Sequence, residues 1–199
     1  MFIDPLGLSP ADVKKRSANH AMILTEDQDV ARTYSLDSNY WKNLTLLGKG
    51  DYKCNLFVAH VLERAGVPYS FARNTTASTT RQKWNRFWGA DVEAYPWHSK
   101  DWWAGRVPGF QRVEVPTPGT VMVSTPLGRH GHVGICVGFI PLPGPGGFPL
   151  VLGLYVSATE NGVELKTFSL AGGVRNGQQW SWRYLDPMAP WERVPPPGK

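Results

Sequence analysis

The stretch that decides the fold covers residues 51–66 and reads DYKCNLFVAHVLERAG. Four of its apolar residues recur at helical spacing: Val58, Val61, Leu62 and Ala65. Asp51 is a favourable N-cap residue, because its carboxylate can accept hydrogen bonds from the first-turn amides. Gly66 followed by Pro68 is typical of a helix end. The pattern therefore predicts a helix with Cys54 in its first turn, on the face that packs inward.

The expected position of Cys54 bears on its chemistry. The unpaired amides and the dipole at a helix N-terminus favour negative charge, and so a thiolate. A cysteine nucleophile needs that thiolate and a neighbouring base. Most free cysteines are instead small buried hydrophobic residues. The helix alone leaves both interpretations open.

Composition narrows the class of protein only partly. The 199 residues suit one domain with a sizeable core plus extensions. The net charge of +5 favours anionic partners such as nucleic acid, a membrane surface or an acidic polymer, without choosing among them. No apolar run is long enough to span a membrane, and the first residues lack the layout of a signal peptide. The two cysteines, Cys54 and Cys136, do not make a disulfide scaffold.

The flanks of the central stretch predict further elements. Ser9 and Pro10 read as the N-cap and first residue of a short helix ending near His20. The next residues, 21–40, are polar and weakly patterned, which predicts a loosely packed leader. A second helix is expected over residues 77–88, ASTTRQKWNRFW.

An aromatic insert, residues 95–109, follows with the sequence YPWHSKDWWAGRVPG. Such long irregular segments in compact domains are often functional. We expect it to form one wall of a substrate groove, with four candidate substrate-binding residues: Trp97, His98, Trp102 and Trp103. The alternative is that its tryptophans fill the core, as large aromatic side chains usually do.

The second half of the chain has strand-like patterning. Residues 119–124 (GTVMVS) and 132–139 (HVGICVGF) predict two strands. Alternation places one set on one face: Val133, Ile135, Val137 and Phe139. It places the smaller set on the other: His132, Gly134, Cys136 and Gly138. We expect the smaller face to lie against the Cys54 helix.

Asn161 and Gly162 are a strong signal for a two-residue hairpin turn between LYVSATE (154–160) and VELKTFSL (163–170). This register would place Ser157 opposite Lys166 and Ala158 opposite Leu165. The end of the chain, residues 187–199, is proline-rich and predicts an extended tail.

The order of these elements suggests Cys-His chemistry, in which a thiolate attacks, an imidazole acts as base and a third group orients the base. His132 is the favoured base, with His130 as the alternative. No cluster of residues has the spacing of metal ligands, so we expect no metal and no cofactor.

Four motifs carry a family resemblance, in the family's own order over residues 41–168. YKCNLFVAHVLERAGV (52–67) resembles the active-site helix of NlpC-type and CHAP-type cell-wall cysteine peptidases. TTRQKW (79–84), PTPGTVMVS (116–124) and GHVGICVG (131–138) resemble the segments that follow it in those enzymes. The resemblance implies an α+β, papain-like domain over residues 41–186, with the Cys54 helix packed on an antiparallel sheet.

The resemblance also implies residue roles. Cys54 would be the nucleophile, His132 the general base and Ser157 the third catalytic residue. The family usually has His, Asn, Asp or Glu at the third position, so three neighbours stay open as alternatives: Thr159, Glu160 and Asn161. Lys53 stands where NlpC-type members commonly have an acidic residue, and a cation there would stabilise a thiolate.

The start of the chain, DPLGL (4–8), resembles the motif that closes the core of Rhs-repeat proteins, where a toxin module begins. Residues 1–40 would then be the Rhs-core junction and leader. The implied function is a peptidoglycan amidase or endopeptidase that cuts stem peptides, secreted as a type VI-like antibacterial effector into a rival's periplasm. Its implied partners are the Rhs core, the secretion apparatus and an immunity protein, with no nucleic acid and no membrane span.

Two alternatives remain open at this point. One is a cysteine protease, deamidase or acyltransferase acting on a protein or lipid, because a fold does not determine its substrate. The other is a nuclease toxin, because Rhs-like C-terminal modules are diverse.

Overall fold

A computed structural model describes residues 8–42, 49–50, 53–74, 95–124, 131–143, 150–170, 173–175 and 178–188. Its helices are α1 (Pro10–Glu26), α2 (Gln28–Thr33), α4 (Cys54–Arg64), α5 (Tyr69–Ala72) and α7 (Ser99–Ala104). Its strands are β1 (Arg73–Asn74), β2 (Tyr95–Pro96), β3 (Phe110–Val113), β4 (Val121–Ser124), β5 (Val133–Leu142), β6 (Leu150–Ala158), β7 (Val163–Phe168), β8 (Gly173–Arg175), β9 (Gln178–Trp180) and β10 (Trp182–Pro187).

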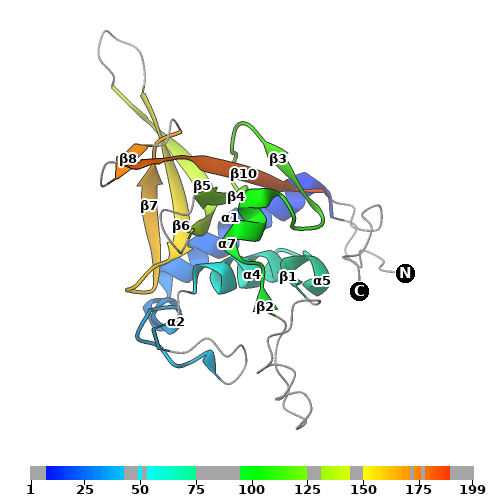
Figure 1. The fold of residues 1–199 in the computed structure, drawn as a ribbon, viewed down its shortest axis with the longest axis vertical. Helices are drawn as coiled ribbons and strands as arrows, with labels where there is room; N and C mark the ends of the chain where they lie inside the picture. The colour runs from blue at the N-terminus through cyan, green and yellow to red at the C-terminus, as the bar shows by residue number, and fades with distance from the viewer. Residues whose placement is uncertain are drawn as a thin grey trace.

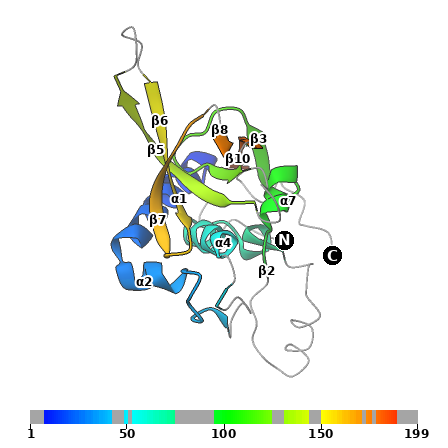
Figure 2. The ribbon, with the colours of Figure 1, turned by 60° about the vertical axis from the view of Figure 1, so that its left-hand side comes forward.

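The main sheet is antiparallel and has the strand order β3-β10-β4-β5-β6-β7. Helices α1 and α4 pack on the same face of this sheet (Figures 1 and 2). The main core lies between these two helices and β4, β5 and β6, where Val58, Val133 and Val156 are fully buried. This arrangement confirms the expected α+β class.

Helix α4 carries Cys54 as its first residue, so the predicted first-turn position is correct. The predicted N-cap is wrong, because Lys53 occupies the N-cap position and makes no side-chain capping bond. The end of the helix follows the prediction: Gly66 has φ 100°. Its N–H donates to the carbonyl of Glu63 at 3.1 Å, as is usual at a glycine-terminated helix.

Helix α1 begins as the sequence predicts. Ser9 is the N-cap, and its side chain and that of Asp12 form a reciprocal capping box. The helix is longer than predicted, because it ends at Glu26 instead of near His20. Ala21 and Leu24 continue its buried stripe at helical spacing, so the expected loose packing of residues 21–40 is wrong.

The sheet is strongly curled. Phe168 on β7 contacts Trp182 and Tyr184 on β10, with ring centroids 5.9 and 6.5 Å apart, although β4, β5 and β6 lie between the two strands. The concave side encloses a second cluster, which we call the sheet-side cluster: Met122, Cys136, Tyr155, Phe168 and Tyr184. The two sides of the sheet therefore have separate cores.

The two faces of β5 differ from the prediction in which one meets α4 and in where Phe139 points. The face with Val133 and Ile135 packs against α4, whereas Cys136 belongs to the sheet-side cluster. The large apolar side chains of β5 are needed to cover the apolar face of α4. The small residues of β5 lie on the opposite face of the sheet, where they leave room for aromatic rings. Phe139 also packs against the sheet-side cluster, because the register shifts between Cys136 and Gly138.

The hairpin between β6 and β7 also differs from its prediction. Ser157 pairs with Glu164, so the loop comprises four residues instead of two. Thr159 closes this loop by donating its N–H to the carbonyl of Gly162 at 2.7 Å. The Glu164 carboxylate accepts from the hydroxyl of Thr159 and from the amide of Asn161, which stabilises the longer turn.

Some predicted features lie outside the described residues: the helix at 77–88, the motif at 79–84, most of the motif at 4–8, and the tail beyond residue 188. Within the described part of the chain, no helix is both long and apolar enough to cross a bilayer.

Candidate functional site

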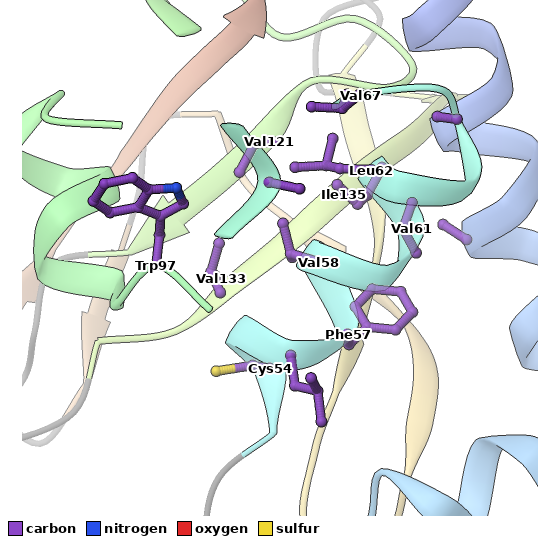
Figure 3. Packing of buried hydrophobic residues seen from close by; sticks show 14 of the residues in the cluster. Cys54, Phe57, Val58, Val61, Leu62, Val67, Trp97, Val121, Val133 and Ile135 are labelled. Carbon is purple, nitrogen blue, oxygen red and sulfur yellow. The ribbon is translucent and has the colours of Figure 1, made fainter. Parts of the chain in front are cut away.

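Cys54 lies at the N-terminus of α4 next to the start of β5 (Figure 3). Its side chain is 4% exposed. The backbone N–H groups of Val133, Asn55 and Cys54 itself are directed at the sulfur and lower its pKa. Burial acts more strongly in the opposite direction, so the pKa of the thiol is raised above its ordinary value. The expected stabilised thiolate is therefore wrong for the resting protein, which holds a neutral thiol.

Lys53 precedes Cys54 and is also buried. Its ammonium donates to the carbonyl of Ser35 at 2.8 Å, which fixes the entry into α4 from the segment after α2. Lys53 is not among the groups that lower the pKa of Cys54. The expectation that this cation stabilises the thiolate is not supported by the geometry.

His132 stands directly before β5 and is held by its main chain. Its N–H donates to the hydroxyl of Ser124 at 3.1 Å, and its carbonyl accepts from the Ser124 N–H at 2.9 Å. Burial, and secondarily the charge of Lys166, lower the pKa of the imidazole to about 4. The ring is therefore neutral at physiological pH, which is the state a general base requires.

The candidate catalytic residues Cys54 and His132 lie on adjacent segments, but their side chains are not hydrogen-bonded to each other. Val133, whose N–H points at the Cys54 sulfur, is the residue after His132. The His132 ring makes an edge contact with Tyr155, at 6.1 Å between centroids, on the sheet-side cluster. The structure thus brings the backbone of the His132 segment to the thiol and leaves the imidazole against Tyr155.

Ser157, the expected third catalytic residue, is fully buried. Its hydroxyl donates to the carbonyl of Val133 at 2.5 Å and more weakly to that of Ala158 at 3.4 Å. These bonds connect β6 to the start of β5 and do not reach the His132 ring. Ser157 therefore positions the start of β5, directly after His132, and its role in orienting the imidazole stays a prediction.

The three alternatives to Ser157 belong to the β6–β7 turn. Thr159 and Asn161 bind Glu164 and the loop backbone. The carbonyl of Glu160 accepts from the N–H of Leu36, which joins the turn to the segment after α2. None of these hydrogen bonds involves the imidazole of His132.

Tyr155 is the site residue that sequence reasoning missed. Burial raises its pKa to about 12, with smaller contributions from Cys54 when that thiol is ionised and from the Glu164 carboxylate, so its hydroxyl stays protonated. Gly134 makes room for it, because a Cβ there would lie 2.8 Å from the Tyr155 ring. The glycine two residues after His132 was the available signal, since it indicates a close approach on the histidine's side of the strand.

The first two tryptophans of the aromatic insert lie in the main core. Trp97 is 7% exposed and donates from its indole N–H to the carbonyl of Phe71 at 2.9 Å. Trp102 is 1% exposed and packs edge-on against Phe110. Their burial favours the core alternative over a groove wall for both.

The other two candidate substrate-binding residues remain accessible. Trp103 is partly exposed, and the guanidinium of Arg183 lies 3.9 Å from the centre of its ring. His98 is exposed at the start of α7, beside Ser99. A Cβ on Gly131, the residue before His132, would lie 2.9 Å from the Ser99 hydroxyl. The start of α7 is therefore adjacent to the His132 segment.

The remaining cysteine and histidine candidates give no sign of a disulfide or a metal site among the described residues. Cys54 and Cys136 are both free thiols. His60 shares a 2.7 Å hydrogen bond with the Tyr34 hydroxyl, and His130 lies outside the described residues. Among the residues the structure describes, no group of three or more His, Cys, Asp or Glu side chains could hold a metal ion.

Comparison of the chain with family models, with curated proteins and with solved structures gives no match. The fold and the site themselves define the class: an α+β protein in which a buried cysteine at a helix N-terminus lies next to the segment that carries His132, directly before β5.

Proposed function

We propose that this protein is a cysteine hydrolase that cleaves amide bonds in the stem peptides of peptidoglycan. The observation that carries the proposal is the placement of the Cys54 sulfur. It lies at the N-terminus of α4, and the amides of Cys54, Asn55 and Val133 are directed at it. Val133 is the residue directly after His132. Backbone amides in this arrangement stabilise negative charge that develops during acyl transfer.

The reaction would proceed through a thioester. A neutral His132 accepts the proton of the Cys54 thiol as the sulfur attacks the substrate carbonyl carbon. The imidazolium then gives this proton to the departing amine as the C–N bond breaks, and water hydrolyses the thioester. Productive catalysis requires the imidazole to come within hydrogen-bond reach of the sulfur. Catalytic hydrogen bonds are often long in proteins without substrate.

The choice of substrate rests on three features. The motifs around Cys54 and His132 resemble those of NlpC-type and CHAP-type cell-wall peptidases. The net charge of +5 suits an anionic polymer. His98 offers an accessible ring beside the His132 segment, and Trp103 offers a partly exposed ring on the same helix. Because residues 4–8 (DPLGL) resemble the motif that closes the core of Rhs-repeat proteins, we also propose that the protein is a secreted antibacterial toxin. It would be delivered to the periplasm of a rival cell and blocked by an immunity protein in the producer.

Digestion of purified peptidoglycan tests the activity. The wild-type protein should release muropeptides with a newly exposed amine, identified by mass spectrometry. Cys54→Ala should release none, whereas Cys136→Ala, which removes the other buried thiol, should retain activity. Thermal melts establish that both variants are folded. Full activity in a folded Cys54→Ala protein would refute the cysteine mechanism.

Expression in bacteria with and without an added secretory signal tests the site of action. Lysis only after export supports a cell-wall substrate. Equal killing from the cytoplasm would instead favour a protein-directed cysteine hydrolase, deamidase or acyltransferase, or a nuclease if Cys54→Ala still kills.

A further inference from the structure

Strands β5 and β6 extend beyond the rest of the main sheet (Figure 1). Strand β4 pairs with β5 only as far as Ile135, and β7 pairs with β6 only from Gly153 onward. Residues 139–142 and 150–153 continue to pair with each other past these neighbours. We call residues 139–143 together with 150–152 the arm.

Both faces of the arm are apolar and exposed. Ile140, Leu142 and Leu150 are 40, 39 and 55% exposed, and the pairing of Leu142 with Leu150 puts these side chains on one face. Val151 is 48% exposed and pairs with the exposed Pro141 on the opposite face. A hairpin that faces water normally has one polar face.

The arm also lacks charge. No Asp, Glu, Lys or Arg occurs between His132 and Glu160, although these four residue types make up 19% of the chain. The chain as a whole has a net charge of +5. The protein thus combines a basic body with an uncharged apolar projection.

The shape and chemistry of the arm favour a lipid surface over another protein chain. A second copy adding a strand to the β5 edge of the arm would meet Pro141, which has no N–H to donate, and proline on an edge disfavours strand pairing. A protein groove would cover one face and leave the other in water. A bilayer interface surrounds both faces, and a basic protein is attracted to anionic headgroups.

The reach of the arm fits the same environment. Leu142 lies three residues past Phe139, about 10 Å along an extended strand. Interfacial segments insert about 5–10 Å into the boundary between headgroups and acyl chains. Among the described residues, no further strand pairs with the outer edges of the arm. Unpaired backbone groups are tolerated at the interface, where water remains, but not in the hydrocarbon centre.

We propose that the arm inserts into the interface of an anionic lipid bilayer and holds the protein on the membrane surface. The proposal goes beyond hydrolysis at Cys54 and does not depend on it.

Co-sedimentation with vesicles tests the arm. The full chain should bind vesicles of phosphatidylethanolamine and phosphatidylglycerol. The paired substitution Leu142→Ser with Leu150→Ser keeps the charge constant and removes two exposed leucines. It should weaken binding by about tenfold or more for each leucine lost, because each inserts a leucine side chain. Leu165→Ser is the matched control, because Leu165 is 45% exposed on β7, away from the arm.

The outcomes separate the possible occupants. Strong vesicle binding that is lost in the paired variant and retained in Leu165→Ser supports the proposal. Absence of vesicle binding by the wild-type protein overturns it, as does an equal loss in the control. Sedimentation velocity without lipid examines the rival: a wild-type dimer that becomes monomeric in the paired variant would assign the arm to a second copy and overturn the proposal.

Discussion

The two adjacent tryptophans of α7 should respond very differently to truncation. Trp102 is 1% exposed and packs edge-on against Phe110, with ring centroids 5.0 Å apart. Truncating a buried Trp to Ala costs about 3–5 kcal/mol through lost burial and the cavity left behind. Trp103 is only partly buried: it packs at the edge of the main core, and the Arg183 guanidinium lies over its ring. Loss of one cation–π contact at such a position costs about 0.5–1 kcal/mol.

Chemical and thermal denaturation measure this difference. For a chain of this size, 1 kcal/mol corresponds to about 2–4 °C in the melting temperature. Trp102→Ala should therefore lower it by about 6–20 °C. Trp103→Ala, which loses the cation–π contact and only partial burial, should lower it by clearly less. If the second variant raises KM for peptidoglycan fragments at this small cost in stability, Trp103 contacts the substrate. Equal losses of stability in the two variants, or a loss under about 1 kcal/mol for Trp102→Ala, would refute the placement of Trp102 in the core.

Two further predictions concern the site. The pKa of His132 is lowered to about 4, so below its ordinary value of 6.5 the unfolded chain binds a proton that the folded protein does not. The free energy of unfolding should therefore fall, by about 3 kcal/mol at most, as the pH drops from 6.5 to 4. Urea titrations at several pH values measure this fall, which should be smaller in His132→Gln. An equal pH dependence in wild type and variant would contradict the burial of the ring. Gly134→Ala should destabilise the protein by about 1–3 kcal/mol and reduce turnover, because the new Cβ meets the Tyr155 ring and the strand backbone. Gly138→Ala, where no atom lies within 4 Å of the new Cβ, is the control, and equal melting temperatures for the two variants would argue against close packing at Gly134.

The sequence predicted helix ends correctly where a residue within one turn of the end determines them. The end of α4 follows from Gly66, which takes the left-handed conformation that other residues resist. The start of α1 follows from Ser9 and Pro10, whose capping and φ preferences act within one turn. The same reasoning failed at Asp51, because several residues before a helix can cap it and the entry of the chain decides which one does.

The faces of β5 show where local reasoning stops. Alternation correctly separates Val133 from Gly134, but it cannot say which set meets the helix, because that depends on where the partners lie. The register shift after Cys136 then moves Phe139 to the sheet-side cluster. A bulge reflects pairing with another strand and has no clear signal in its own strand.

The sequence by itself determined the helical position of Cys54, the strand that follows His132 and the order of these two elements along the chain. Those properties depend on periodicity and capping within a few residues. Tertiary structure alone decided the protonation states and the neighbours, because burial and backbone amides from other elements set them. Burial raises the pKa of Cys54, the Val133 amide reaches its sulfur from β5, and Tyr155 from β6 meets the His132 ring.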